Sequence, residues 1–303
     1  MFYYLFFQTI KINNEKILFF EKGLSAQQIG VLLKNEKIIG NNIIFNLLVK
    51  VSGLNKKIQA GEYSFYGELT VVDVIKILEK SRFYYRKITI PECFTVSKTL
   101  ELLNSNIFLT GKIKAKPDEG SIFPDTYFFL RNEKRNKLVN IMKRKMNVVV
   151  NEVMKDNKTQ LKSKEEVIKL ASIINAETKI NSEKFLVASV FHNRLKKNMR
   201  LQSDPTILYA INLNKKKEVR KIYKKDLKSD NPWNTYTRNN LPLTAICNPG
   251  LVSLQAAIKP ASSNFYYFVS DGEGGHKFSS NLKDHRENIK LWKKKLLKTN
   301  AIK

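Results

Sequence analysis

The chain has 303 residues, of which 43% are hydrophobic and 11% aromatic, so it can bury a sizeable core and is not intrinsically disordered. Lys and Arg total 54 against 27 for Asp and Glu, and the formal charge of +27 would ordinarily indicate a polyanionic partner. The charge is mostly lysine spread along the chain, and no zinc-finger, P-loop or aromatic RNA-binding motif accompanies it, so we do not predict nucleic-acid binding.

Residues 1–20 begin with an apolar run that Lys11, Glu15 and Lys16 interrupt. The run is too short to span a bilayer and does not have the form of a standard signal peptide. A first β-strand is one interpretation of this segment.

Residues 21–85 have the pattern of a small α+β module. Ser25 is placed to cap a first helix, and a second helix ends near Gly53. A short strand then leads to Thr70, which precedes a third helix. The next region repeats a strand, predicted over residues 87–90, and a helix. The charged segment 131–164 predicts a long surface helix.

Cys93 and Cys247 are the only two cysteines. They lie far apart in the sequence, without a CxxC motif or a Cys/His cluster, so they indicate neither a metal site nor a disulfide framework. We expect both thiols to remain free, with a disulfide as the less favoured alternative. On this expectation the cysteines do not indicate a compartment.

The segment from Ser163 to Glu177 holds the clearest candidate for catalysis. Ser163 and Glu166 have the spacing of a capping box that starts a helix. One face of this helix carries Val167, Leu170, Ala171 and Ile174. Glu177 continues the apolar face, where burial would raise the pKa of its carboxyl towards the range of a general acid. The alternative is that the helix ends there and Glu177 turns to solvent.

Polar residues after this helix are candidates for a binding cleft. Asn193 and Arg194 lie at the end of a predicted helix, where their side chains can reach into a cleft. Gln202 and Asp204 lie on a loop that Pro205 holds rigid. A rigid loop with an amide and a carboxylate suits hydrogen bonds to sugar hydroxyls. The alternative is that Asp204 caps the helix that Pro205 starts. The segment 234–236 allows the same two interpretations, as a sugar-binding loop or as a structural turn.

The C-terminal region predicts a loop, a helix that begins at Pro249, a β-hairpin with a Gly-rich turn, and a final amphipathic helix. The glycines do not open a helix after a strand, as a dinucleotide site requires, so we predict no cofactor. A lone histidine beside a hairpin, such as His276, is more often structural than catalytic.

Several motifs closely resemble those of the endolytic murein transglycosylase (YceG-like) family, which cuts peptidoglycan glycan strands. They cover roughly the last two thirds of the chain and include ASIINAET, VASVFHNRL, MRLQSDPTILYA, NPWNTY, LPLTAICNPG and FYYFVSDGEGGHKFSSNLKDH. The segment EGSIFPDTYFF resembles a further family motif. The resemblance implies an α+β fold in which a small LysM-like module, residues 21–85, precedes a mixed α+β catalytic region, residues 86–303.

The resemblance also implies roles for individual residues. The catalytic acid would be Glu177, the Glu directly before Thr in its helix. Many family members carry a second Glu two residues earlier, where this chain has Asn175. The predicted substrate-binding residues are Asn193, Gln202, Asp204, Thr206, Asn234, Tyr236, Asn248 and His276. The family requires no metal and no cofactor.

The expected partners are peptidoglycan glycan strands and, as a further suggestion of the resemblance, peptidoglycan synthases. Family members usually start with one membrane-spanning helix, so Phe2 to Phe7 could be the end of an anchor whose beginning is absent from this sequence. We weigh this interpretation equally with the β-strand. The expected location is the bacterial cytoplasmic membrane, with the catalytic region on the extracytoplasmic side.

The expected activity is endolytic cleavage of the MurNAc–GlcNAc β-1,4 bond in nascent strands, which leaves 1,6-anhydro-MurNAc ends and limits strand elongation. A lytic transglycosylase needs only one catalytic carboxylic acid, because a hydroxyl of the sugar replaces water. One alternative is a catalytically silent cell-wall or division-complex binding protein, which Asn175 would permit. The other is a basic protein that binds nucleic acid or anionic membranes.

Overall fold

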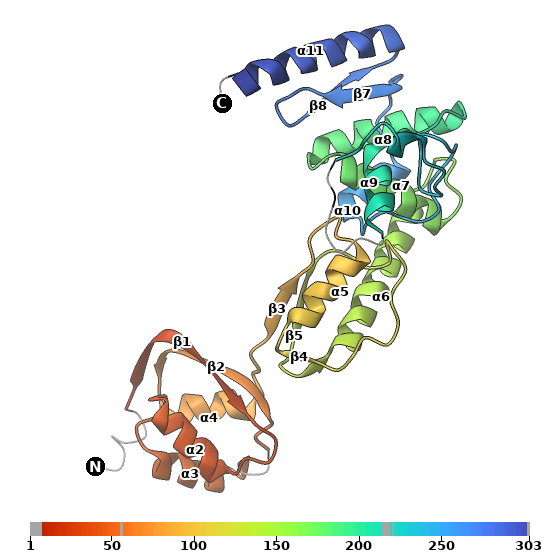
Figure 1. Cartoon of the computed structure of the whole chain (residues 1–303). Coiled ribbons are helices and arrows are strands. Elements are labelled where there is room, and N and C mark those ends of the chain that lie inside the picture. Colours follow the sequence, from red (N-terminus) through yellow and green to blue (C-terminus); the bar gives the residue numbers. More distant parts are fainter. Residues whose placement is uncertain (1–7, 55–56, 214–218, 220, 302–303) are drawn as a thin grey trace. The chain divides into compact units, whose positions relative to one another are not determined.

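The structure is a computed structural model that describes residues 8–54, 57–213, 219 and 221–301 (Figure 1). Its helices and two-stranded sheets confirm the predicted α+β class. The chain divides into two compact units. As far as these ranges are described, unit 1 comprises Met1–Ile88, Phe108–Thr110 and Tyr127–Lys134, and unit 2 comprises Thr89–Ile107, Gly111–Thr126 and Arg135–Lys303. The chain therefore returns to unit 1 twice after Ile88.

Unit 1 contains a long antiparallel strand pair and three helices. Strand β1 (Ile10–Phe20) pairs with β2 (Gly61–Leu69), which confirms the β-strand interpretation for these residues. The predicted anchor segment, Phe2 to Phe7, lies outside the described residues. The helices are α2 (Ala26–Asn35), α3 (Asn42–Val51) and α4 (Val71–Glu79). The LysM-like character of this part of the chain stays a prediction.

The helices of unit 1 begin and end where local sequence signals predict. Ser25 Oγ accepts a hydrogen bond from the Gln28 N–H at 3.3 Å, and the Gln28 side chain completes a capping box. Thr70 starts α4 in the same way. Gly53 follows α3 with φ of +67°, a left-handed conformation that costs glycine little because it has no Cβ.

A buried acid holds a later segment of the chain on unit 1. Glu62 is 2% exposed, and its carboxylate accepts hydrogen bonds from Arg86 Nε at 2.7 Å and Arg131 Nη1 at 3.2 Å. Burial raises the pKa of Glu62, but the hydrogen bonds from the two guanidinium groups outweigh burial and hold the pKa below its usual value. Arg131 thereby attaches the segment Tyr127–Lys134 to this unit.

The middle of the chain adds two further strand pairs. Strand β3 (Arg86–Thr89) pairs with β5 (Thr126–Phe129), and β4 (Leu109–Thr110) pairs in parallel with β6 (Glu133–Lys134). The predicted strand over residues 87–90 is therefore present, shifted by one residue.

Unit 2 has a helical core. Helices α7 (Lys164–Glu177), α8 (Asn181–Lys196) and α10 (Leu251–Ile258) pack against one another and bury a shared set of apolar side chains. The other helices of the unit are α5 (Val96–Ser105), α6 (Arg135–Met154), α9 (Asp204–Asn212) and the short 3₁₀ helix η2 (Asp226–Lys228).

Two helix predictions for unit 2 are wrong in part. Helix α6 ends at Met154, and it buries Met142, Met146 and Val150 in the core, so it is not simply a surface helix. Its apolar residues recur at helical spacing between the lysines, and this stripe directs one face inwards. Helix α10 begins at Leu251, two residues after the predicted start, with Gly250 as its N-cap.

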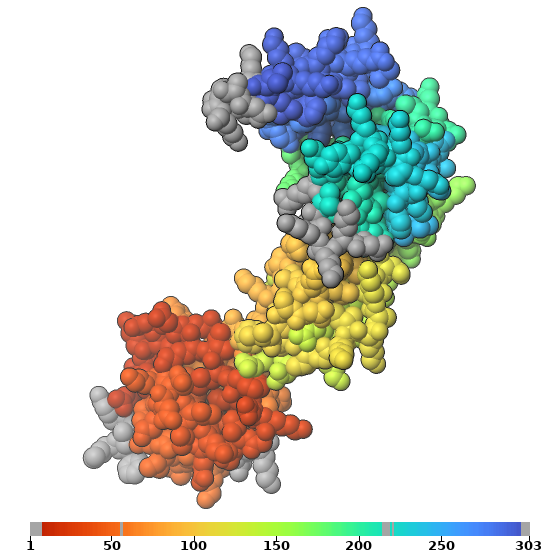
Figure 2. All heavy atoms as spheres, viewed as in Figure 1, coloured from red at the N-terminus to blue at the C-terminus, as the bar shows by residue number. Residues whose placement is uncertain are grey.

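The C-terminal part of unit 2 follows the predicted order of elements. Strands β7 (Tyr267–Ser270) and β8 (His276–Ser279) form an antiparallel hairpin. Helix α11 (Leu282–Ala301) packs on this hairpin. In Figure 2 the helix is blue and lies at the surface of the unit. This position agrees with its many exposed lysine side chains.

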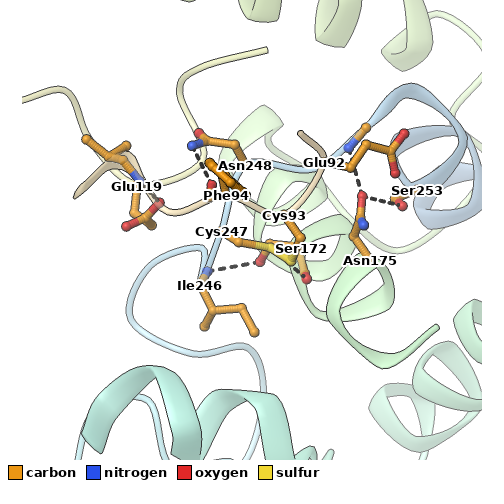
Figure 3. Close-up of a disulfide and its surroundings, with 12 residues drawn as sticks. Glu92, Cys93, Phe94, Glu119, Ser172, Asn175, Ile246, Cys247, Asn248 and Ser253 are labelled. Atoms are coloured by element: carbon orange, nitrogen blue, oxygen red, sulfur yellow. Dashed lines mark hydrogen bonds between the residues drawn. A yellow bond between two sulfur atoms is a disulfide. The ribbon is translucent and has the colours of Figure 1, made fainter. Parts of the chain in front are cut away.

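Cys93 and Cys247 form a disulfide, so the expectation of two free thiols is wrong (Figure 3). The fold brings the segment after β3 alongside the loop before α10, although 154 positions separate the cysteines in the sequence. Backbone hydrogen bonds hold the two segments together, from Cys93 N to Asn248 O at 2.9 Å and from Asn248 N to Phe94 O at 3.0 Å. Sequence spacing could not reveal this contact because it is entirely tertiary.

Candidate active site

Glu177 is the last residue of α7, and its side chain is only partly exposed. The helix does end at this residue, as one interpretation of the sequence proposed. The carboxylate nevertheless does not turn to solvent, because Ser203 Oγ donates a hydrogen bond to Glu177 Oε1 at 2.5 Å. Among the residues that the structure describes, none makes a hydrogen bond to the other oxygen, Oε2. One carboxyl oxygen is thus held by the protein, and the other remains available.

A group of buried hydroxyls holds Ser203 in place. Ser203 N donates to Thr235 Oγ1 at 2.9 Å, and Thr206 Oγ1 donates to Ser203 O at 2.7 Å. The two threonine hydroxyls lie 3.0 Å apart. Thr206 is fully buried at 0% exposure, and its hydroxyl is used within this group. This arrangement favours a structural role, and contact of Thr206 with substrate stays a prediction.

Asp204 and Tyr236 form a hydrogen-bonded pair next to this group. Tyr236 Oη donates to Asp204 Oδ1 at 2.5 Å. Asp204 is the first residue of α9, where Ser203 is the N-cap and no side chain makes a capping hydrogen bond, so the capping alternative is wrong. Gln202 is exposed, and its N–H donates to Thr235 O at 3.0 Å. The structure therefore gathers three predicted binding residues around Ser203, and their contact with substrate stays a prediction.

The surroundings of Glu177 favour a carboxyl group that can both donate and accept a proton near neutral pH. Burial raises the pKa of Glu177 to about 7, against the opposing effect of the Ser203 hydrogen bond. The negative charge of Asp204 adds to the increase, and the positive charge of Arg194 reduces it. A general acid is most effective when its pKa lies near the working pH.

Three predicted binding asparagines hydrogen-bond the protein backbone. Asn234 and Asn248 are 1% and 0% exposed, which favours a structural role. Contact of either residue with substrate stays a prediction. Asn193 is partly buried, and its amide nitrogen is already used by two carbonyls. The carbonyl partners are those of Ser263 and Phe265 for Asn193, of Ser229 for Asn234, and of Phe94 for Asn248.

His276 joins the C-terminal hairpin to the start of α8. Its Nδ1 lies 2.8 Å from Glu183 Oε2, and its backbone N–H donates to Glu183 Oε1 at 2.9 Å. Thr178 Oγ1 donates to the same carboxylate at 3.1 Å. These bonds support a structural role for His276, and substrate contact by this residue stays a prediction. Within the described ranges, no group of three or more His, Cys, Asp or Glu side chains could hold a metal ion.

Asn175, where the resemblance to the family led us to expect Glu in many members, has a structural role in this chain. Its Oδ1 accepts hydrogen bonds from Gly250 N and Ser253 Oγ, both at 2.9 Å (Figure 3). The residue is 7% exposed. It therefore fixes the start of α10 on α7, two residues before Glu177.

Sequence reasoning did not single out Ser203, and it placed Arg194 only among the polar side chains that could reach into a cleft. Arg194 is 6% exposed, and its guanidinium donates to Leu201 O at 2.6 Å and Tyr266 O at 2.7 Å. Arg194 places a positive charge in a largely buried helix, and this was a signal in the sequence. A buried ion needs partners, so such a residue indicates a polar site. Ser203 offered no signal of its own beyond its place within MRLQSDPTILYA.

The fold and site define an α+β enzyme in which Glu177 is a carboxylic acid suited to general acid–base chemistry. The model of the YceG-like family matches residues 18–291, and the chain belongs to this family. It is 29% identical over 313 residues to the endolytic murein transglycosylase of Bacillus subtilis (strain 168), covering 92% of this chain and 83% of that protein. The predicted family and the predicted enzyme class, lytic transglycosylase, are confirmed.

Two further relatives agree with this assignment. The endolytic murein transglycosylase of Streptococcus pneumoniae serotype 2 (strain D39 / NCTC 7466) is 23% identical over 312 residues, covering 88% of this chain and 56% of that protein. This chain therefore spans little more than half of that relative. A 2.6 Å crystal structure of a YceG-like protein from Listeria monocytogenes has a TM-score of 0.57 and 28% identity, covering 91% of this chain and 99% of that one.

Proposed function

We propose that this protein cleaves the MurNAc–GlcNAc β-1,4 bond inside peptidoglycan strands and leaves 1,6-anhydro-MurNAc ends. The observation that carries the proposal is Glu177, a carboxylic acid with one oxygen held by Ser203 and a pKa of about 7. The names of the relatives supply the substrate class. The +27 charge suits a polymer whose stem peptides carry carboxylates. Cleavage within nascent strands would limit their elongation.

The reaction requires two proton transfers at one carboxyl group. Protonated Glu177 donates its proton to the glycosidic oxygen as the bond from MurNAc C1 to that oxygen breaks. The resulting carboxylate then takes the proton of the MurNAc C6 hydroxyl while O6 bonds to C1. The anhydro ring closes, Glu177 is protonated again, and the number of atoms balances without water.

Hydrolysis is the alternative reaction that could use Glu177 as the acid. It normally needs a second carboxylate, about 5–5.5 Å away as a nucleophile or about 6.5–9.5 Å away as a base for water. Asp204 is the candidate that the motif suggests, and its charge acts on Glu177. Its Oδ1 already accepts the Tyr236 hydroxyl, which favours a positioning role.

We expect mass spectrometry of digested glycan to find 1,6-anhydro-MurNAc ends, each lighter than a reducing end by one water. We also expect cuts inside strands, which leave fragments of medium length and not disaccharides released from an end. A digest dominated by reducing ends would require a hydrolytic water and would contradict the proposed reaction.

We expect Asp204→Asn to move the alkaline limb of the pH–rate profile to lower pH. The wild-type rate should fall as pH rises through about 7, because the first step needs protonated Glu177. The Asp204 charge raises the pKa of Glu177, so its removal lowers that pKa and the limb moves with it. Asp230→Asn, which changes an exposed carboxylate paired with Arg238, is the matched control and should leave the limb in place.

We also propose that the catalytic region works on the extracytoplasmic side of a bacterial cytoplasmic membrane. The Cys93–Cys247 disulfide supports this location, because disulfides persist in oxidising compartments and are rare in the cytosol. Within the part of the chain that the structure describes, no helix is both long enough and apolar enough to cross a membrane. An N-terminal anchor and an association with peptidoglycan synthases remain proposals.

A further inference from the structure

The hydrogen bond between Ser203 and Glu177 distinguishes the two oxygens of the catalytic carboxyl group. We propose that Ser203 is a positioning residue that makes Oε1 a fixed acceptor and leaves Oε2 to carry the transferable proton. The inference rests on the proposed function, since it assigns a role in the reaction of Glu177. Neither the family motifs nor the names of the relatives assign Ser203 a role.

The geometry of Ser203 allows little movement of its hydroxyl. The backbone of Ser203 is held on both sides, with its N–H bound to Thr235 Oγ1 at 2.9 Å and its carbonyl bound by Thr206 Oγ1 at 2.7 Å. All three residues are at most 2% exposed, so water does not compete for these bonds. The backbone of Ser203 is therefore fixed, and its hydroxyl lies 2.5 Å from Glu177 Oε1.

This arrangement fits both proton transfers. A hydroxyl has a single proton to donate, and when that proton points at Oε1, the acid proton of Glu177 is placed on Oε2. As Glu177 donates its proton to the glycosidic oxygen, negative charge develops on the carboxyl group, and a hydrogen bond to a charged acceptor is stronger. The Ser203 bond is thus stronger in the transition state than in the ground state, which is the condition for accelerating the step. The Ser203 proton stays on Ser203 throughout.

The charged groups that face Glu177 come from separate elements. Arg194 on α8 lowers the pKa of Glu177, and Asp204 on α9 raises it. Tyr236 binds Asp204, and burial together with this bond raises the pKa of the Tyr236 hydroxyl far above neutral, so it stays protonated. Ser203 differs from all three because it is the residue that directly hydrogen-bonds the carboxylate.

The test compares Ser203→Ala with Ser203→Thr, which retains a hydroxyl. We expect Ser203→Ala to lower kcat by about 10- to 100-fold, the value of a hydrogen bond to a charged group, with KM little changed. We also expect the alkaline limb of the pH–rate profile to move to higher pH, because the Ser203 bond lowers the pKa of Glu177. Ser203→Thr should keep most of the wild-type kcat and most of the wild-type position of the alkaline limb. Ser189→Ala removes an equally buried hydroxyl that binds Leu186 O and Ser263 Oγ, and it should change neither.

A second readout separates this inference from the proposed function. The titration of the Glu177 carboxyl, followed by ¹³C NMR with the Glu177→Gln spectrum for assignment, does not require activity. A higher midpoint in Ser203→Ala than in the wild-type protein would support the positioning role even if no glycan were cleaved. Wild-type kcat and an unmoved midpoint in a folded Ser203→Ala protein would overturn it. A failure of the proposed function alone would instead appear as intact glycan with a shifted midpoint.

Discussion

Glu177→Gln is expected to abolish glycan cleavage while the protein remains folded. The amide keeps the shape of the side chain and can still accept the Ser203 hydrogen bond, but it has no transferable proton. General acid–base catalysis typically contributes about 10²–10⁴-fold, so the loss should be at least of this order. Release of soluble fragments from purified peptidoglycan measures the activity, and thermal unfolding measures the fold.

The control for this variant is Glu165→Gln on the same helix. Glu165 is an exposed carboxylate paired with Lys169 at 2.7 Å, and its replacement should leave cleavage nearly unchanged. Turnover by Glu177→Gln close to that of Glu165→Gln would show that Glu177 is not the acid.

The free energy of unfolding of the wild-type protein and that of Glu177→Gln should also respond differently to pH. The pKa of Glu177 is raised from 4.5 to about 7 in the folded protein, so the folded state holds this proton more tightly than the unfolded chain. The resulting stabilisation is present below about pH 4.5 and is lost as pH rises through about 7. Glu177→Gln should therefore lose less stability than the wild-type protein between pH 5 and pH 8.

Replacing both cysteines with serine is expected to lower the free energy of unfolding by about 2–5 kcal/mol. The disulfide closes a loop between residues 154 positions apart, and such a cross-link restricts the unfolded chain strongly. The same bond also ties the loop before α10 to the segment after β3, beside α7. Urea unfolding of the oxidised protein and the double variant measures the difference.

Reductant provides the control for this prediction. Dithiothreitol should destabilise the wild-type protein towards the level of the Cys93→Ser, Cys247→Ser variant, and it should have no effect on that variant. Equal midpoints for the wild-type protein with and without reductant would mean that the disulfide does not contribute to stability. We expect activity at low temperature to survive in the double variant, because neither cysteine hydrogen-bonds Glu177.

The sequence by itself determined the features that depend on neighbours along the chain. The capping residues Ser25, Thr70 and Ser163 hydrogen-bond backbone within one helical turn. Their partners are therefore close in the sequence, and the spacing predicts the caps. The β7–β8 hairpin before α11 also pairs two strands that are close in the sequence. The place of Glu177 at the end of an apolar helix face was also readable, because helical periodicity directs side chains. The family motifs added the assignment of this residue as the acid.

Only the tertiary structure decided which side chains meet. Ser203 lies 26 positions from Glu177, and Cys93 lies 154 positions from Cys247, so no local pattern connects either pair. The same reason explains why the sequence did not reveal that Asn234 and Asn248 are buried against backbone carbonyls. A polar side chain in a loop can face a substrate or the backbone of another segment, and its sequence is the same in both cases. Burial selects between the two, and burial follows from packing of the whole unit.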